Sequence, residues 1–561
     1  MPDAQGQKRH HWQWRSLSIA LGILFAALTL SAGYVTGAGP FWKSLGGDVA
    51  MGQIGWFYYA HDAWRFPLFA IGNTHLPEGS NLLLFDGLPL LALPAKLLYT
   101  LTGSAAATPP IYAGCWVASC LVLQAVAASR LLLTLDIRKP APHIAGVALF
   151  CYMPMLFLRF GQAGLMGQFF ILFALEGYVR AKRNGLTSNQ WIALCAWPLI
   201  ALLVHPYLAA MSGIVVCASI LDQWRERRLS FLGVLIRVGS MAVAAVAIIW
   251  IGGFMAAAAA NFGDYGLYSL NLLSPIIPFP GTLSGHLLHT AIPSAPGLFQ
   301  WEGGSYLGAG VFLLAVAALP SLKNWRAGLH RHLVLVIVLV LVLLFAISNR
   351  VGFGSHELFS VPLPARVIDG LSEFRGSGRF VWIAVYALLA ALIAITVNRY
   401  RRRSAALLIA AALLQIADVA PMQAAVHAAS TRASEAAIDR AAWQKLIAEH
   451  DRVFEYPSFE CGGLFGRGVP GTRWRVLSID WIAAQSNKPN NSAYQTRSTK
   501  DCARERREAV TRFDQPGTLY LYRSSEEIGA LLAGRGVVTP RCGYLDDVVV
   551  CSATEDLSGL R

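Results

Sequence analysis

Long apolar runs constrain this chain more than any other feature of its sequence. The run Leu333–Phe345 contains only leucine, valine, isoleucine and phenylalanine. Only 14% of the 561 residues are charged, whereas a soluble protein carries about a quarter charged residues. Because about 20 apolar residues are enough to cross a bilayer core of about 30 Å, such runs predict membrane-spanning helices. The sequence therefore predicts a polytopic α-helical membrane protein.

Eleven segments have the length and composition of a membrane span. The first is long for the apolar region of a signal peptide, about 7–15 residues, so we expect it to be retained. The two segments around His205-Pro206 leave an alternative open, because merging them into one helix would invert the orientation of everything that follows. The predicted spans are 16–38, 110–133, 143–160, 164–180, 190–204, 207–222, 231–253, 306–320, 332–348, 379–397 and 404–420.

Short basic links between the spans predict the orientation of the chain. They all fall on one side of the membrane if Met1 is cytoplasmic, as the positive-inside rule requires. An odd number of spans then places residues 421–561 outside the cytoplasm. We expect a multi-pass membrane protein with a cytoplasmic N-terminus and an extracytoplasmic C-terminal domain. The links are Arg138-Lys139, Arg180–Arg183, Arg225–Arg228, Lys323–Arg331 and Arg399–Arg403.

The net charge of +14 does not indicate a nucleic-acid partner. Residues 421–561 contain eighteen Lys and Arg against seventeen Asp and Glu, so the surplus lies in the first 420 residues. There it belongs to the links between spans, where it specifies topology. We therefore expect the chain to contact membrane lipid and to bind no nucleic acid.

The sequence divides into a transmembrane domain, residues 1–420, and an extracytoplasmic domain, residues 421–561. Alternating apolar patterns in the second part predict strands at Arg452–Tyr456, Thr518–Tyr522 and Asp547–Cys551. Helical stretches near 474–486, 499–510 and 525–534 alternate with these strands, which indicates a small α/β domain. The polar stretch Asn487–Arg497 either contacts a glycan acceptor or forms a solvated loop, and the solvated loop is the expectation.

Four of the nine cysteines lie in the extracytoplasmic domain. An even count in an exported domain favours two disulfides, for which three pairings exist. We expect Cys461–Cys502 and Cys542–Cys551, the second closing a hairpin. The alternative is four unpaired buried thiols.

The first outer loop, residues 39–109, contains the carboxylates Asp48, Asp62 and Asp86. Its aromatic stretch Val49–Phe69 and its apolar stretch Asp86–Leu101 are too short or too interrupted to span. Because Trp and Tyr favour the membrane interface, we expect two helices lying along the outer surface. Asp48 then stands at the entrance of the first helix.

Two later outer loops contain candidate sugar- and phosphate-binding residues. Asp264, Tyr268 and Glu302 are polar groups among aromatics and glycines, a combination that sugar sites use; an ordinary structured loop is the alternative. Arg375 and Arg379 flank a Gly-rich turn at the start of a span. Free backbone N–H groups and guanidinium forks there favour a phosphate, with a lipid-contacting helix start as the alternative.

A further arginine, Arg159, lies at the outer end of the third predicted span. It breaks the positive-inside pattern, which adds it to the candidate phosphate-binding residues. The sequence contains no P-loop, dinucleotide fingerprint, nucleophile elbow or HExxH helix.

The chain resembles the integral-membrane glycosyltransferases of the C type, the GT-C superfamily. The resemblance covers the layout of nearly the whole chain: many spans, an acidic residue in a first outer loop built from two juxtamembrane helices, and a C-terminal outer domain. It rests on short motifs, and these resemble a bacterial branch of the superfamily, which implies a bacterial inner (cytoplasmic) membrane and a periplasmic C-terminal domain. The motifs are Gly47-Asp48, Phe85-Asp86-Gly87, Trp301-Glu302-Gly303 and Phe374–Arg379.

The resemblance implies a polyprenyl-phosphate sugar as donor and a surface glycan or lipid as acceptor. Asp48 is then the catalytic base that deprotonates the acceptor hydroxyl, and hexosyl or pentosyl transfer proceeds with inversion. The arginines at 159, 375 and 379 then stabilise the leaving phosphate. A second acidic residue directly beside Asp48 is missing, so we expect no metal ligand and no cofactor, with a divalent cation as the alternative.

Two other functions compete with this interpretation. One is a polyprenyl-diphosphate-dependent glycan ligase or polymerase, which would also need arginines outside. The other is a lipid-linked sugar transporter or flippase. A transporter should show internal repeats and ionisable residues near mid-membrane. The sequence shows no clear repeat and few charges away from span ends, which favours an enzyme.

Overall fold

The computed structural model describes residues 4–43, 46–103, 109–255, 265–433, 438–462, 464, 473–497, 500–511, 515–523 and 541–560. The chain divides into two compact units. Unit 1 comprises Met1–Ala32, Cys115–Ile248 and Asn261–Ser430. Unit 2 comprises Gly33–Gly114, Ile249–Ala260 and Thr431–Arg561, so the first outer loop groups with the C-terminal residues.

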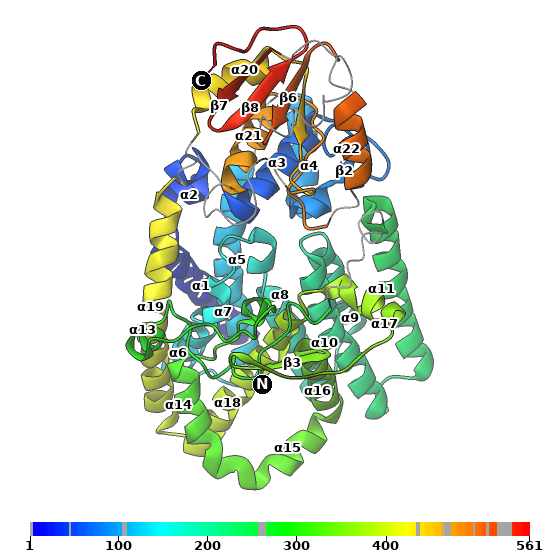
Figure 1. Cartoon of the computed structure of the whole chain (residues 1–561). Helices are drawn as coiled ribbons and strands as arrows, with labels where there is room; N and C mark the ends of the chain where they lie inside the picture. Colours follow the sequence, from blue (N-terminus) through cyan, green and yellow to red (C-terminus); the bar gives the residue numbers. More distant parts are fainter. Residues whose placement is uncertain are drawn as a thin grey trace. The chain divides into compact units, whose positions relative to one another are not determined.

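Unit 1 is helical (Figure 1). A short hairpin of β3 (Arg350–Phe353) and β4 (His356–Ser360) interrupts its helices. The main helices are α1 (Ala4–Thr29), α5 (Pro109–Thr134), α6 (Pro140–Cys151), α8 (Phe169–Asn184), α9 (Ser188–Leu202), α10 (Pro206–Arg225), α11 (Phe231–Gly252), α14 (Ala309–Ala318), α16 (Leu333–Ile347), α18 (Val381–Tyr400) and α19 (Ser404–Thr431). The shorter elements are α7 (Pro154–Phe157), η4 (Ala163–Met166), α13 (Leu283–Leu288), η5 (Gln300–Gly303), η6 (Leu319–Asn324), α15 (Trp325–Arg331), α17 (Ala365–Leu371), η7 (Ser372–Phe374) and η8 (Ser377–Phe380).

Five helices in the described part of the chain are long and apolar enough to cross a membrane. They are Ile111–Thr134, Pro206–Arg225, Phe231–Gly252, Ser377–Tyr400 and Ser404–Thr431. Four shorter helices are also apolar. The prediction of a helical chain with several apolar helices is thus confirmed, and each of the eleven predicted ranges contains a helix. α9 ends at Leu202 and α10 begins at Pro206, so the two segments around His205-Pro206 are separate helices.

Close helix contacts in unit 1 depend on small residues. A methyl group at Gly310 of α14 would lie 2.1 Å from the carbonyl oxygen of Ala411 in α19. The backbone N–H of Gly310 also donates to the side-chain oxygen of Gln415, at 3.0 Å. Only glycine allows this separation, because any Cβ would overlap the neighbouring backbone.

Unit 2 combines the helices of the first outer loop with a four-stranded sheet (Figure 1). Its helices are α2 (Ala32–Thr36), η1 (Pro40–Lys43), α3 (Gly47–His61), η2 (Leu82–Phe85), α4 (Pro89–Thr102), α20 (Arg440–Ala448), α21 (Arg473–Gln485) and α22 (Cys502–Thr511). Its strands are β1 (Ala70–Ile71), β2 (Ser80–Asn81), β5 (Arg452–Tyr456), β6 (Thr518–Tyr522), β7 (Arg541–Leu545) and β8 (Val548–Ser552). α3 and α4 occupy the two stretches predicted as surface helices.

The sheet has the strand order β5-β6-β8-β7. β5 and β6 are parallel, whereas β8 runs antiparallel to both β6 and β7. Period-two alternation gives it two buried faces: Val453, Leu519 and Val550 belong to one core cluster, and Phe454 and Tyr520 belong to the other. The strand β7 was not predicted, and the predicted helix 525–534 lies outside the described residues.

The predicted disulfide pairing is confirmed. Cys461 bonds Cys502, with their Cα atoms 5.5 Å apart, and Cys542 bonds Cys551 across β7 and β8. The first disulfide attaches the start of α22 to the segment after β5. Because a crosslink reduces the conformational freedom of the unfolded chain, both stabilise this region.

Candidate functional site

An arginine cluster in unit 1 brings together three predicted site residues. Arg159 follows α7, Glu302 lies in η5 and Arg379 in η8. Glu302 Oε2 lies 2.7 Å from Arg159 Nη1 and 2.7 Å from Arg379 Nη2. Arg159 Nη2 also donates to the Glu302 carbonyl oxygen, at 2.6 Å. Two guanidinium groups thus share one carboxylate, which leaves the cluster with one net positive charge.

The electrostatics of this cluster follow from burial and proximity. Arg159 and Glu302 are buried, and the Arg379 side chain is nearly so. Burial alone would raise the pKa of Glu302, but the charges and hydrogen bonds of Arg379 and Arg159 outweigh it and hold the pKa below its ordinary value. Burial, together with the same two arginines, lowers the pKa of His205, so that this imidazole is neutral.

Aromatic rings support the arginines. Arg379 lies 4.9 Å from the ring centre of Tyr207, and Arg375 lies 5.5 Å from that of Tyr268. Cation–π contacts of this kind hold a guanidinium without neutralising it. Tyr207, at the start of α10, was not among the predicted site residues. One ring face of Tyr268 is already stacked on Phe299.

The Gly-rich turn does not offer the backbone cradle that was predicted for a phosphate. The N–H of Gly376 donates to the Tyr207 hydroxyl at 2.7 Å, and the N–H of Gly378 donates to the Tyr268 carbonyl at 3.1 Å. The N–H of Arg379 donates to the Gly376 carbonyl. These three donors are used within the fold, so that part of the prediction is wrong. Anion binding at this turn would fall to the guanidinium groups.

Asp48 lies in the first turn of α3 in unit 2. The helix begins at Gly47, whose φ of 58° is in the left-handed region that favours glycine. A carboxylate in a first helical turn interacts favourably with the helix dipole. The hydroxyl of Tyr494 donates to Asp48 Oδ1 at 2.8 Å. A residue 446 positions away along the chain therefore orients the predicted base.

The polar segment 487–497, which carries Tyr494, is not a solvated loop. Asn490 and Ser492 are almost completely buried. Asn490 exchanges backbone hydrogen bonds with Asn73 and Leu76, and Thr74 donates its hydroxyl to Asn490 Oδ1 at 2.7 Å. The expectation of a solvated loop is therefore wrong, because the polar groups of this segment pair with the first outer loop instead of with water.

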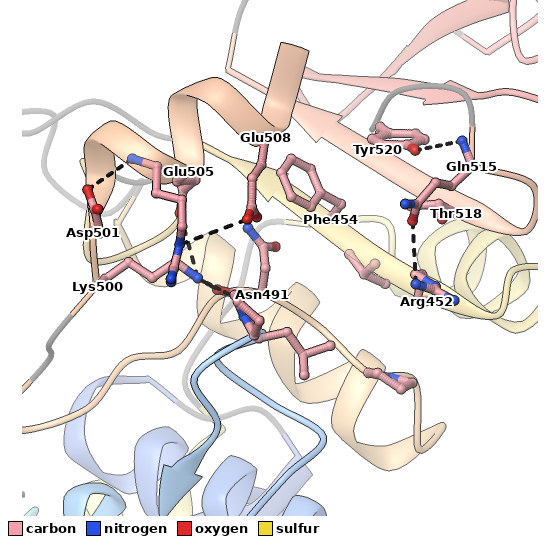
Figure 2. A pocket seen from close by; sticks show the side chains of 15 residues that line it. Arg452, Phe454, Asn491, Lys500, Asp501, Glu505, Glu508, Gln515, Thr518 and Tyr520 are labelled. Atoms are coloured by element: carbon pink, nitrogen blue, oxygen red, sulfur yellow. Dashed lines mark hydrogen bonds and ion pairs between the residues drawn. The ribbon is translucent and has the colours of Figure 1, made fainter. Parts of the chain in front are cut away.

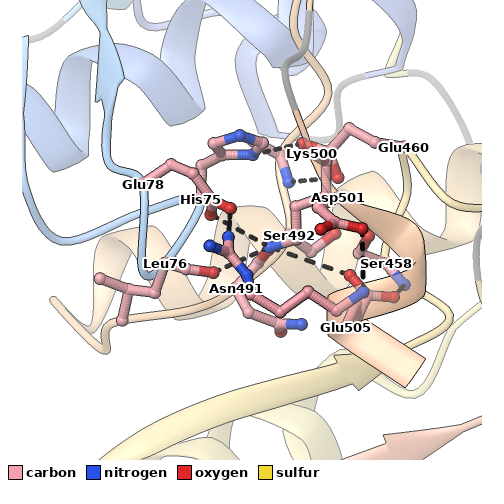
Figure 3. Close-up of polar contacts among 12 residues, drawn as sticks. His75, Leu76, Glu78, Ser458, Glu460, Asn491, Ser492, Lys500, Asp501 and Glu505 are labelled. Carbon is pink, nitrogen blue, oxygen red and sulfur yellow. Dashed lines mark hydrogen bonds and ion pairs between the residues drawn. The ribbon is translucent and has the colours of Figure 1, made fainter. Parts of the chain in front are cut away.

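A second set of contacts ties the same segment in place (Figure 3). Lys500 Nζ donates to the carbonyl oxygens of Leu76 and Asn491, at 2.8 and 2.5 Å. His75 Nδ1 lies 2.7 Å from Glu460 Oε1. Figure 3 shows these groups converging from the first loop and from the C-terminal residues. They fix the backbone from which Tyr494 reaches Asp48.

The other predicted carboxylates have structural contacts. Asp62 accepts hydrogen bonds from the Arg65 guanidinium and from the N–H groups of Ala63 and Gly72, which closes the turn after α3. These contacts hold the pKa of Asp62 below its ordinary value, although burial opposes them as the largest single effect. Asp86 ends η2 in a left-handed conformation, with φ 53°. Asp264 lies outside the described residues.

Lys96 is a buried cation that the sequence interpretation missed. Its ammonium group lies 4.1 Å from the ring centre of Tyr59 and 4.8 Å from that of Trp64. Burial lowers the pKa of Lys96 to about 8, while the nearby Asp62 charge acts in the opposite direction. The signal was a single lysine within the apolar stretch 88–101.

A buried pair of carboxyl groups lies beneath the segment 487–497. Glu455 of β5 and Asp480 of α21 are both almost inaccessible. The Asn491 side chain accepts a hydrogen bond from the Glu455 N–H and donates one to the Glu455 carbonyl oxygen. The Asn490 amide donates to Asp480 Oδ1 at 3.1 Å. Burial raises the pKa of both carboxyl groups, and the proximity of Glu455 raises that of Asp480 further.

The Glu455→Gln variant should lose a pH dependence of stability. A carboxyl whose pKa is raised by folding holds its proton more tightly in the folded state, so stability falls as pH rises from the unfolded pKa through the folded one. We expect the wild-type melting temperature of unit 2 to be higher near pH 5 than near pH 8, and the variant to show a smaller difference. The comparison of wild type with this variant leaves the neighbouring ionisable side chains unchanged, namely Glu460, Glu505, Lys500 and His75. A pH response identical to that of wild type would contradict the assignment, and Glu449→Gln, at an exposed position at the end of α20, is the control.

No group of three or more His, Cys, Asp or Glu residues that could hold a metal ion occurs in the part of the chain that the structure describes.

Comparison with protein families identifies the chain. A family model described as a domain of unknown function, DUF6311, matches residues 19–420. The chain belongs to the DUF6311 family. A second model, described as the DUF6311 C-terminal domain, matches residues 442–553. No curated protein matches this DUF6311 chain.

Several solved structures are similar to this DUF6311 protein. One is the archaeal oligosaccharyltransferase AglB from Archaeoglobus fulgidus, in complex with an inhibitory peptide and a dolichol-phosphate. It is 13% identical with a TM-score of 0.42, and the match covers 86% of this chain and 64% of that one, so this chain spans less than two thirds of its length. Another is ArnT from Cupriavidus metallidurans bound to undecaprenyl phosphate, at 11% identity and a TM-score of 0.43, covering 100% of both chains.

Proposed function

We propose that this protein is a membrane glycosyltransferase that moves a sugar from a polyprenyl-phosphate donor to a glycan or lipid acceptor on the periplasmic side. The observation that carries the proposal is Asp48, held in the first turn of α3 by the Tyr494 hydroxyl at 2.8 Å. An oriented carboxylate at a helix start is suited to accept a proton from an incoming hydroxyl.

In the proposed reaction, Asp48 takes the proton of an acceptor hydroxyl as its oxygen attacks the anomeric carbon of the sugar. The bond between that carbon and the phosphate oxygen breaks, and its electron pair leaves with the polyprenyl phosphate. Because the attack comes from the face opposite the phosphate, the anomeric centre inverts. No other reactant is needed for the atoms and charges to balance.

The arginine cluster is assigned to the phosphate. Its one net positive charge, on Arg159 and Arg379 around Glu302, suits a leaving group that gains negative charge. The guanidinium forks are held by Glu302 and by the Tyr207 ring before any ligand arrives, so little rearrangement is required. Arg375 on Tyr268 is a second candidate contact.

The proposal is tested by mass spectrometry of surface glycans from a deletion strain. The strain is complemented at matched expression with wild type, with Asp48→Asn or with Asp136→Asn, an exposed carboxylate between α5 and α6. We expect a sugar-sized mass to disappear on deletion and to return with wild type and Asp136→Asn only. An unchanged glycan profile in the deletion strain would overturn the enzyme assignment and favour a transporter.

A further inference from the structure

Lys500 joins two parts of unit 2 that meet at the proposed base. Its ammonium group donates to the carbonyl oxygen of Leu76 in the first outer loop, at 2.8 Å, and to that of Asn491, at 2.5 Å. Figure 2 shows Lys500 beside Asn491, close to the start of α22. An ammonium group has three N–H donors, so one lysine can hold two carbonyl groups at a fixed separation. The Lys500 side chain is only 4% exposed, so water competes little for these carbonyls.

The two carbonyl contacts of Lys500 are shorter than its ion pairs. Glu505 Oε2 and Glu78 Oε2 lie 3.8 and 3.9 Å from the ammonium nitrogen. Burial lowers the pKa of Lys500, whereas the nearby charge of Glu460 acts in the opposite direction and favours the ammonium form. The surrounding carboxylates thus supply negative charge, while the hydrogen bonds themselves hold the backbone.

The residues that follow Asn491 lead to Asp48. Tyr494 is three residues further along the chain, and its hydroxyl donates to Asp48 Oδ1 at 2.8 Å. Three residues of extended chain span at most about 11 Å, so a displacement of the Asn491 backbone is passed on to Tyr494. The contact between Lys500 and Asn491 is therefore well placed to control where the Tyr494 hydroxyl lies.

The turn after β5 holds the other side of Tyr494. The Phe459 N–H donates to Ser492 Oγ at 3.0 Å, and the centre of the Phe459 ring lies 4.8 Å from that of Tyr494. Glu460 Oε2 accepts from the Ala493 N–H at 3.4 Å. Each of the two residues before Tyr494 thus has a contact with this turn.

A disulfide attaches the turn after β5 to the chain beside Lys500. Cys461 bonds Cys502, which is two residues beyond Lys500. Glu505, in the first turn of α22, accepts a hydrogen bond from the Ser458 N–H at 2.8 Å. The turn and the start of α22 therefore form one connected support, which Lys500 extends to the first outer loop.

We propose that Lys500 is a positioning residue, which keeps the Tyr494 hydroxyl on Asp48 during sugar transfer. It acts through the Asn491 backbone and not on the reacting atoms. The importance of Lys500 for transfer rests on the proposed function, whereas its effect on the position of Tyr494 does not.

The first test measures transfer by purified Lys500→Met, which keeps the length of the side chain but has no donor. Its kcat should fall about three- to ten-fold, the effect of losing one net hydrogen bond. The KM for the donor should not change, because the donor phosphate is assigned to the arginine cluster. In a Tyr494→Phe background, Lys500→Met should lower kcat less than two-fold further, since the hydroxyl that it positions is already absent. Lys445→Met, at an exposed position in α20, is the control and should match the parent protein in both backgrounds.

The second test needs no activity. Tyr494 is replaced by 3-fluorotyrosine, and its fluorine NMR signal is recorded in the full-length protein below the melting temperature. Asp48→Asn shows how far the signal moves when the partner of the hydroxyl is altered. Lys500→Met should also move the signal from its wild-type position, whereas Lys445→Met should leave it in place.

A further pair of variants keeps the second test decisive if Lys500→Met folds poorly. Cys461→Ser combined with Cys502→Ser releases the support beside Lys500 and should move the fluorine signal. Cys542→Ser combined with Cys551→Ser removes the other disulfide and should leave the signal in place.

The outcomes separate this proposal from the proposed function. A wild-type kcat in Lys500→Met, an equal fold-loss in both backgrounds, or a fluorine signal that Lys500→Met leaves in place would each overturn the positioning role. If wild type transfers no sugar while the signal still moves in Lys500→Met and not in Lys445→Met, the proposed function fails and the positioning of Tyr494 by Lys500 stands.

Discussion

Replacing Asp48 by asparagine should reduce sugar transfer by about 10²- to 10⁴-fold, the range that a positioned acid or base contributes. Asparagine keeps the size of the side chain and can still accept a hydrogen bond from the Tyr494 hydroxyl. It has no basic carboxylate, so it cannot take the acceptor proton. The measurement is the rate of transfer by purified wild type and variant at equal amounts, with the melting temperature followed in parallel.

The Tyr494→Phe variant separates orientation from proton transfer. Phenylalanine removes only the hydroxyl that donates to Asp48 Oδ1, so activity should fall less than in Asp48→Asn. The pH profile should keep its shape, because the proposed base, Asp48, remains. If Asp48→Asn retains wild-type activity, Asp48 is not the base, and the carboxylates at 62 and 86 become the next to test.

Glu302→Ala should destabilise unit 1 by about 3–5 kcal/mol, which is the usual cost of removing one partner from a buried ion pair. Glu302 is the common acceptor for Arg159 and Arg379, whose side chains are 2% and 12% exposed. Without the carboxylate, two like charges remain close together in a poorly hydrated place. A thermal unfolding measurement in detergent should show a clearly lower melting temperature.

Glu357→Ala provides the matched control in the same unit. Glu357 forms a two-contact pair with Arg350, but both side chains are a quarter or more exposed. Exposed pairs contribute about 0–1 kcal/mol, so this variant should melt close to wild type. Equal melting temperatures for the two variants would show that the arginine cluster is not the buried network described above.

Local patterns in the sequence predicted much of the fold. Apolar runs located the helices, and period-two alternation located β5 and β6 to the residue. The even cysteine count predicted two disulfides, and the expected pairing is the one observed. The helices and strands depend on residues that are close together in the sequence, and the number of disulfides follows from the number of cysteines. β7 was missed because its alternation is interrupted by Gly543.

The site could be predicted only in part. Arg159, Glu302 and Arg379 were each singled out, the first because it broke the charge pattern of the links. Nothing in the sequence showed that Glu302 pairs with both arginines, since 143 and 77 residues separate the partners. Tyr494 lay in a segment expected to be solvated. The polar composition of segment 487–497 predicted exposure, whereas its amide side chains are buried against the first loop.

The most direct test of the proposed sugar transfer is the lipid product of the purified protein. The protein is incubated with a polyprenyl-phosphate hexose and an acceptor extract from the deletion strain, and the lipids are analysed by mass spectrometry. We predict that wild type releases free polyprenyl phosphate in the same amount as glycosylated acceptor, and that Asp48→Asn releases neither. Consumption of a polyprenyl-diphosphate donor with no reaction of the monophosphate, or equal product from Asp48→Asn, would contradict it.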